Sequence, residues 1–217
     1  MTMKKYFDKL VTRYPVLRPI LPSIEQTAAE MAELFRRGGT FFVAGNGGSG
    51  ADAEHICGEL LKGFKSRRTL RESDKAALLA ADPLVGAALG DALQYGLPAV
   101  SLLSHPALTS AFGNDVDPEL AFAQQLWALG KPGDICMGIS TGGNAANIYK
   151  TFAVARAKKI RTILLTGNRH GSCERLADIV IAAPDAETYR IQELHLPIYH
   201  TLCMAVESQF FTMIEDK

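Results

Sequence analysis

Two side chains that can move protons, His55 and Glu59, lie four residues apart in the first third of the chain. In a helix, residues at this spacing project from the same face, one turn apart. An imidazole beside a carboxylate can act as a general acid–base pair or supply two metal ligands. The same spacing is just as typical of a surface ion pair. The surrounding residues must therefore decide between a functional role and a surface ion pair.

The segment before this pair is typical of an anion site. Phe41–Val43 form the apolar run expected of a buried parallel strand, and the glycine-rich stretch 45–50 follows it. The glycines allow a tight turn and a close approach to a ligand, and the free N–H groups of the next helix point back at the loop. A phosphate cradle followed by a His/Glu pair indicates an enzyme that acts on a small phosphorylated substrate.

Two common nucleotide motifs fit this stretch poorly. Gly45–Gly50 matches G-x-G-x-x-G, but a dinucleotide site also requires an acidic residue about twenty positions on, at the end of the second strand. The chain has KSRRTLRES there, and the next strand is not expected before Ala99. The sequence also contains no G-K-[ST], which excludes a nucleoside-triphosphate P-loop. We therefore favour a phosphate loop of another kind.

A second loop of this kind begins at Ser140. The sequence STGGN, Ser140–Asn144, follows an expected strand at 134–139 and precedes a helix expected from Ala145 to about Lys158. Hydroxyls and free N–H groups converge there as in the first loop, and two such loops at the carboxyl ends of strands mark where α/β proteins bind ligands. Taken alone, the loop is equally typical of an ordinary helix N-terminus with glycines for the turn.

The rest of the chain forms the scaffold that positions these loops. Five strands are expected, at residues 41–43, 99–103, 134–139, 161–165 and 178–182. Between and around them we expect helices in residues 4–38, 75–94, 119–129, 145–158 and about 190–214, with a turn at Gly113–Asp115. This alternation predicts an α/β fold with a doubly wound parallel sheet.

Composition limits the classes of function. The 217 residues suffice for one large domain, and 23 Lys plus Arg balance 23 Asp plus Glu. This balance argues against a nucleic-acid partner, and no apolar run is typical of a signal peptide or a membrane span. The four cysteines are far apart and form no C-x-x-C, which predicts free, buried thiols in a reducing cytoplasm. They are Cys57, Cys136, Cys173 and Cys203.

Four motifs, in order, carry a family resemblance. They are GNGGSxxDAxHxxxEL at 45–60, GND at 113–115, ISTxGNxxN at 139–147 and RIQExH at 190–195. Together they resemble the phosphoheptose isomerases, a family of sugar-isomerase (SIS) domain proteins, over nearly the whole chain. The resemblance implies one SIS domain over residues 1–217. Its fold would be a flavodoxin-like, three-layer αβα sandwich with a five-stranded parallel sheet, preceded by N-terminal helices in residues 1–38.

The resemblance also implies a reaction, the interconversion of D-sedoheptulose 7-phosphate and D-glycero-D-manno-heptose 7-phosphate. It implies a cytoplasmic homotetramer with active sites between subunits and one zinc ion per subunit. Such an isomerisation moves a proton between C1 and C2 through an enediol, so a carboxylate must take and return it. Glu59 is the expected base and His200 the expected acid, and zinc would polarise the carbonyl.

Carried over by motif position, the functional residues of the family fall into three groups. The catalytic residues are Glu59 and His200. The metal positions are His55, Glu59, Gln192 and His200. The substrate-binding positions are Asn46, Gly47, Gly48, Ser49, Glu59, Asn114, Asp115, Ser140, Thr141, Gly142 and Gln192.

Gln192 and His200 pose a geometric difficulty, because eight residues of straight helix rise about 12 Å, which is too far for both side chains to bind one metal ion. Three explanations are open. Gln192 lies at a non-helical start, Pro197 shifts the path of the helix, or the ligands come from different subunits. His195 is expected to pack or to face solvent rather than bind metal.

Departures from the family pattern leave the substrate open. The phosphate loop of the family reads STSGNS, so Gly142 and Ala145 replace two hydroxyl residues here. Residues 70–94 form an insertion that would serve as a lid, an oligomer contact or a specificity element. An isomerase or sensor for a different sugar phosphate is therefore one alternative. Another is a non-catalytic SIS protein, like the relative that binds the bacterial replication initiator, although such relatives lack the equivalents of Glu59 and His200.

Overall fold

The computed structural model describes residues 3–211 and is built on a parallel sheet. Its strands are β1 (Phe41–Gly45), β2 (Ala99–Ser101), β3 (Ile135–Ile139), β4 (Arg161–Gly167) and β5 (Ile179–Ala183), in the spatial order β2-β1-β3-β4-β5. Every neighbouring pair is parallel, with Phe41 opposite both Ala99 and Ile135. The expected α/β fold is confirmed, and each strand begins and ends within two residues of its expected bounds.

The central strands are buried on both faces, as a parallel sheet covered by helices requires. Phe41 and Val43 of β1 pack into one apolar cluster, whereas Phe42 and Ala44 pack into another. This division follows from the period of two along a strand, which points successive side chains to opposite faces. The core therefore has two halves, one on each side of the sheet.

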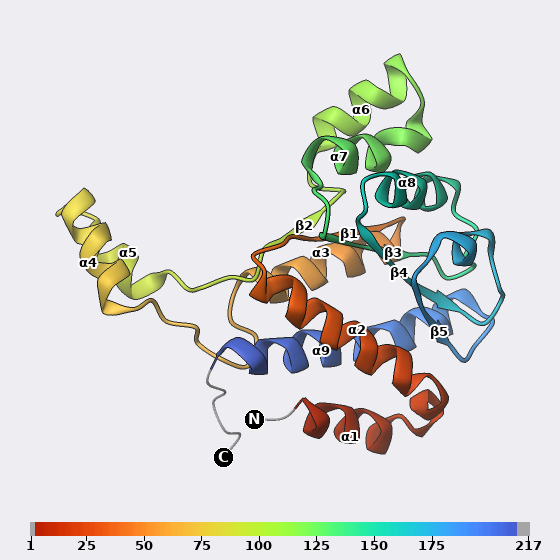
Figure 1. Cartoon of the computed structure of the whole chain (residues 1–217), viewed down its shortest axis with the longest axis horizontal. Coiled ribbons are helices and arrows are strands. Elements are labelled where there is room, and N and C mark those ends of the chain that lie inside the picture. Colours follow the sequence, from red (N-terminus) through yellow and green to blue (C-terminus); the bar gives the residue numbers. More distant parts are fainter. Residues whose placement is uncertain (1–2, 212–217) are drawn as a thin grey trace.

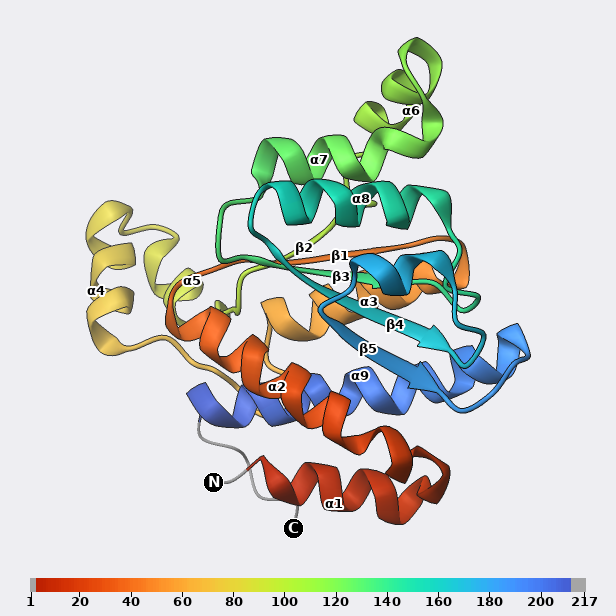
Figure 2. The ribbon, with the colours of Figure 1, turned by 45° about the vertical axis from the view of Figure 1, so that its right-hand side comes forward.

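Helices form the outer layers (Figure 2). α7 (Ala121–Leu129) and α8 (Ala146–Ala157) lie on one face, and α2 (Leu21–Arg36), α3 (Gly48–Leu61) and α9 (Thr188–Phe210) lie on the other. α1 (Lys4–Arg13) packs outside this second layer, against α9. The result is a three-layer αβα sandwich preceded by N-terminal helices.

The segment between α3 and β2 projects from the body of the molecule (Figure 1). It forms α4 (Glu72–Ala81) and α5 (Gly86–Ala92), and its two ends meet at an antiparallel bridge between Thr69 and Gln94. The Tyr95 hydroxyl donates to Asp74, which ties α4 to the base of the projection. That residues 70–94 are an insertion, and that residues 1–217 form a single domain, stay predictions.

The prediction of a turn at Gly113–Asp115 is wrong, because these residues form the end of α6 (Pro106–Asp115). Pro106 occupies the first helical position, where its missing N–H is harmless, and the N–H of Val116 closes the helix on Phe112 O. A Gly-Asn-Asp sequence suits the last turn of a helix as well as a free turn. The residues upstream of it decide in favour of the helix.

Short 3-10 segments complete the description, at η1 (Pro15–Ile20), η2 (Pro118–Leu120) and η3 (Ser172–Leu176). All four cysteines are buried and free, as expected. Within residues 3–211, no helix has both the length and the apolar character needed to cross a membrane.

Candidate active site

The loop after β1 turns sharply and opens α3. Gly47 has a φ of +54°, a conformation that favours glycine, and α3 begins at the next residue. Gly48 lies so close to α9 that a Cβ at this position would be 2.6 Å from Gln192 Nε2. Asn46, Gly47 and Gly48 are exposed, whereas Ser49 is buried. The first N–H groups of α3 therefore point into an accessible loop with an amide side chain beside it.

The loop after β3 is held in place by its own side chains and by the loop after β4. Gly143 has a φ of +66°, and its N–H donates to Ser140 O at 2.9 Å. Asn144 Nδ2 donates to Gly142 O at 3.0 Å, while Asn144 Oδ1 accepts from Ser172 N at 2.8 Å. Of the expected phosphate-loop residues, Ser140 is buried and Thr141 and Gly142 are partly exposed.

The two loops meet where the strand order reverses. β1 leads through α3 to β2 at one edge of the sheet, and β3 leads through α8 towards the other edge, which is where open α/β sheets form a ligand crevice. Asn46 Nδ2 donates to Asn147 Oδ1 at 3.0 Å, and Asn147 Nδ2 donates back to Asn46 Oδ1 at 2.8 Å. The amide of Asn46, expected to contact sugar, is thus engaged in joining the loops. Sequence reasoning missed Asn147, although it ends the third motif.

His55, Glu59 and His200 meet between α3 and α9. His55 Nε2 lies 3.5 Å from Glu59 Oε1 and 3.4 Å from His200 Nε2. The Glu59 side chain is only 13% exposed, and its Oε2 accepts from Lys62 Nζ at 3.0 Å. The structure therefore brings the expected base and acid to the same imidazole, although His55 and His200 are 145 residues apart in the chain.

Burial sets the protonation of the two histidines on α9. Burial, and next the neighbouring His55, lower the pKa of His200, which favours a neutral ring. A neutral imidazole can bind a metal ion, accept a proton or donate a hydrogen bond to a carbonyl oxygen. His195 is fully buried with Nε2 3.2 Å from Thr166 O, and burial lowers its pKa to about 4. His195 therefore packs in the core, as expected.

Two imidazole nitrogens and a carboxylate oxygen form a donor set that zinc commonly takes. Tetrahedral zinc with bonds of about 2.0–2.1 Å holds its donors about 3.4 Å apart, close to both separations at His55. In the part of the chain that the structure describes, no three His, Cys, Asp or Glu side chains already stand in metal-binding geometry. His55, Glu59 and His200 are thus the kinds of donor that zinc takes, and their two separations at His55 suit it, but the three side chains as placed here do not form a metal-binding group.

Gln192 lies apart from this cluster. It is part of α9, which continues past Pro197, so a non-helical start at Gln192 is wrong and α9 is unbroken up to His200. Gln192 contacts α3 at Gly48, whereas His200 contacts it at His55. α3 and α9 therefore run in the same direction, and the two contacts are about two helical turns apart. One chain therefore does not bring all four expected metal ligands together. A change in the path of α9 at Pro197 and ligands from different subunits are the explanations that stay open.

Asn114 and Asp115 are also remote from the cluster. They end α6, which lies beside α7 on the opposite side of the sheet from α3 and α9 (Figures 1 and 2). Both are exposed, and Asn114 Nδ2 donates to Asp115 Oδ1 at 2.8 Å. Their expected contact with the sugar stays a prediction.

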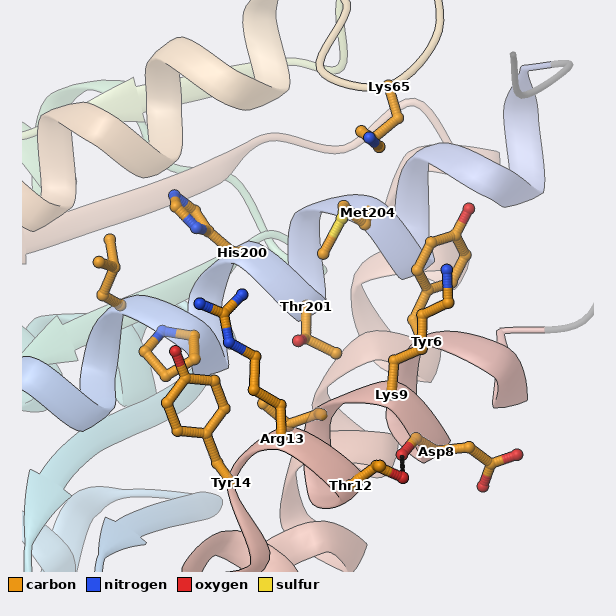
Figure 3. Close-up of a pocket in the computed structure, with 13 residues that line it drawn as sticks. Tyr6, Asp8, Lys9, Thr12, Arg13, Tyr14, Lys65, His200, Thr201 and Met204 are labelled. Carbon is orange, nitrogen blue, oxygen red and sulfur yellow. Dashed lines mark hydrogen bonds between the residues drawn. The ribbon is translucent and has the colours of Figure 1, made fainter. Parts of the chain in front are cut away.

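A groove between α1 and α9 opens onto His200 (Figure 3). Its volume is about 710 Å³, and it is lined by Arg13 at the end of α1, by Tyr14 directly after it, and by Leu196 and His200 of α9. Of the three cluster residues, the groove reaches His200.

Fold and site together place the chain in a class of α/β proteins. The SIS domain family model matches residues 105–210. The solved phosphoheptose isomerase of Francisella tularensis has the same fold, with a TM-score of 0.74 and 28% identity over 94% of this chain and 96% of that one. The phosphoheptose isomerase of Neisseria gonorrhoeae has a TM-score of 0.72 and 26% identity, again over 94% of this chain and 96% of that one. The chain is an SIS-type α/β protein.

Proteins of similar sequence identify the family within this class. The phosphoheptose isomerase of Aneurinibacillus thermoaerophilus is 37% identical over 192 residues, which cover 88% of this chain and 84% of that protein. The phosphoheptose isomerase of Trichlorobacter lovleyi is 34% identical over 208 residues, or 96% of this chain and 93% of that protein. The chain belongs to the phosphoheptose isomerase family.

Proposed function

We propose that this chain is an aldose–ketose isomerase that interconverts D-sedoheptulose 7-phosphate and D-glycero-D-manno-heptose 7-phosphate. The observation that carries this proposal is the meeting of His55, Glu59 and His200 on helices that start beside the two-loop cradle. α3 rises about 10 Å from Gly48 to His55, a span that suits an extended seven-carbon sugar phosphate better than a triose phosphate. The loops would hold the phosphate, and C1 and C2 would lie at the cluster.

Glu59 is the residue that we assign to the carbon-bound proton. Its carboxylate takes a proton from C1 of the ketose, which leaves an enediol, and returns the proton to C2 to form the aldose. At the same time the hydroxyl proton on O1 must pass to O2. His200 is suited to this transfer, because one nitrogen of its neutral ring can give its proton to O2 and then take the proton of O1, which leaves the other nitrogen for a metal ion.

We propose zinc as the cofactor, one ion per subunit. His55, Glu59 and His200 would hold it, and the two oxygens of Glu59 would let one bind while the other takes the proton. When bound, zinc would act as a Lewis acid that polarises the substrate carbonyl. A fourth position is left for the substrate, water or Gln192 of a second copy.

We also propose a cytoplasmic homotetramer with active sites between subunits. Gln192, Asn114 and Asp115 lie away from the His55 cluster within one chain, and the α1–α9 groove leaves His200 open. A neighbouring copy would bring the missing groups to the cluster. The four buried free thiols are typical of a reducing compartment.

The substrate is tested by comparing kcat/KM for sedoheptulose 7-phosphate, fructose 6-phosphate and ribulose 5-phosphate. We expect the seven-carbon ketose to be preferred. A different preferred ketose would support an isomerase of another specificity, which the missing hydroxyls at Gly142 and Ala145 favour. Ligand binding without turnover of any ketose would support the non-catalytic alternative, against which the presence of both Glu59 and His200 argues.

Removal of zinc is expected to lower turnover at least tenfold, because the carbonyl would lose its Lewis acid. The measurement is activity after dialysis against a chelator and again after adding zinc, with metal content determined in parallel. The His55→Gln variant, which lacks one proposed ligand, should respond much less to added zinc. Full activity in chelated protein that contains no metal would reduce His55 and His200 to acid–base or packing roles.

A further inference from the structure

Tyr199 joins α9 to α3 beside the candidate site. It is 1% exposed, and its hydroxyl donates to Asp52 Oδ1 at 3.1 Å and lies 3.1 Å from His55 Nδ1. Because Tyr199 precedes His200, two consecutive residues of α9 contact the two nitrogens of the His55 ring, Tyr199 at Nδ1 and His200 at Nε2. The three rings meet edge to face, with centroids 5.0 to 5.4 Å apart.

The number of available protons fixes the direction of these hydrogen bonds. A phenol has one proton and an ionised carboxylate can only accept, so the proton of Tyr199 goes to Asp52. The ordinary pKa of a phenol is about 10, so the hydroxyl keeps this proton at neutral pH. The contact with His55 then requires that Nδ1 carries a hydrogen and donates it to the phenol oxygen. A neutral His55 is left with a lone pair on Nε2.

We propose that Tyr199, oriented by Asp52, is a positioning residue that fixes the Nδ1–H tautomer of His55 and aims the Nε2 lone pair at Glu59 and His200. This role rests on the function proposed above, since a ring nitrogen binds zinc or accepts a substrate proton only through its lone pair.

Glu59 competes with Tyr199 for the ring proton of His55. Glu59 Oε1 lies 3.5 Å from His55 Nε2 and, as a carboxylate, accepts hydrogen bonds. In the other tautomer, His55 would therefore donate from Nε2 to Glu59. That hydrogen bond would occupy both the lone pair of the imidazole and an oxygen of the proposed base. The phenol at Nδ1 holds the proton on the far side of the ring and keeps both groups available.

The direct test is the ¹⁵N–¹H NMR spectrum of the histidine rings in the metal-free, full-length protein. The chain has five histidines, so the His55→Gln variant can assign the signals of His55. Wild type should show the Nδ1–H tautomer. Tyr199→Phe keeps the ring packing and removes the hydroxyl, and we expect His55 to shift to the Nε2–H tautomer. Tyr95→Phe is the matched control, because it removes a Tyr–Asp hydrogen bond that involves neither His55 nor Tyr199 and should change nothing at that ring.

Asp52→Asn gives a second, independent variant in case Tyr199→Phe does not fold. The amide of asparagine can donate to the phenol oxygen, which frees the Tyr199 proton for His55 Nδ1 and reverses the tautomer, as replacing an orienting carboxylate does in catalytic triads. If His55 kept the Nδ1–H form in folded Tyr199→Phe or folded Asp52→Asn protein, the proposal would be overturned.

Zinc binding and kinetics separate a positioning role from a purely structural one. Tyr199→Phe should weaken zinc binding by about 10- to 100-fold, as loss of a hydrogen bond to a ligating histidine typically does. It should lower kcat while leaving KM unchanged, and Tyr95→Phe should affect neither. Unaltered zinc affinity in Tyr199→Phe would contradict the proposal. An inactive wild type would contradict the proposed function alone, because the tautomer is read without turnover.

Discussion

Replacing Glu59 by Gln is expected to lower kcat with sedoheptulose 7-phosphate by about a thousandfold or more, within the usual range for loss of a general base. An amide cannot take the proton from C1, yet it keeps the shape of the side chain. Glu59 reaches His55 and Lys62 from the face of α3 that meets α9, so the isostere should fill the same space. Turnover should be lost while the fold and ligand binding are retained.

Glu54→Gln is the matched control for this variant, because Glu54 lies on the same helix but is exposed. We expect its activity to equal that of wild type. The measurements are kcat and KM by product formation and the melting temperature of each variant. Near-normal turnover in folded Glu59→Gln protein would remove Glu59 as the base and leave the reaction without an assigned one.

Loss of the carboxylate of Glu207 is expected to have the largest effect on stability, about 3–5 kcal/mol. Glu207 and Arg68 form an ion pair whose side chains are both 0% exposed, with Arg68 Nε 2.8 Å from Glu207 Oε1. Glu207 also accepts from the N–H groups of Phe64 and Lys65, at 2.8 and 2.7 Å. Glu207→Gln would leave a buried guanidinium without its counter-charge, which is the most unfavourable way to break such a pair.

The same guanidinium holds the end of the helix that carries Glu59. Arg68 Nη1 donates to Leu60 O at 2.6 Å and Nη2 donates to Glu59 O at 3.2 Å, so two carbonyl groups at the C-terminus of α3 are satisfied by a side chain. Arg68 also stands at the base of the projecting α4–α5 segment, where its carbonyl accepts from Tyr95 N at 2.8 Å. The pair therefore links α3, α9 and the projection.

Urea unfolding measures the predicted loss as a free energy of unfolding. Glu33→Gln breaks the exposed pair with Arg36, 3.5 Å long, and should change stability by less than about 1 kcal/mol. The double variant Arg68→Met/Glu207→Leu should lose less than the sum of the single changes, because no charge stays buried alone. A loss below 1 kcal/mol in Glu207→Gln would show that the pair contributes far less than its burial implies.

Local pattern was enough to predict the scaffold. The apolar runs beginning at Phe41, Ile135 and Arg161 became neighbouring strands of one parallel sheet, and the glycines after the first two runs became tight turns with positive φ. The pairing of His55 with Glu59 also followed from helical spacing, because both lie on α3. These features depend on residues close together in sequence, where backbone geometry dictates which side chains share a face.

Contacts between distant segments could not be predicted in this way. Asp52 and Tyr199 are 147 residues apart, and Arg68 and Glu207 are 139 apart, so neither pair leaves a periodic signal in the sequence. Both pairs form only because tertiary packing brings α9 beside α3 and the segment that follows it. The expected turn at Gly113–Asp115 failed for a related reason, because residue types that suit a turn also suit the end of α6.

The isomerase activity can be observed directly by NMR when the purified wild-type chain is incubated with sedoheptulose 7-phosphate in D₂O. We expect conversion to the aldose 7-phosphate, with solvent deuterium appearing at C2 because the proton passes through Glu59. Sedoheptulose 7-phosphate that binds but yields no aldose, with or without added zinc, would contradict the isomerase assignment. It would instead identify the chain as a sugar-phosphate-binding member of the family.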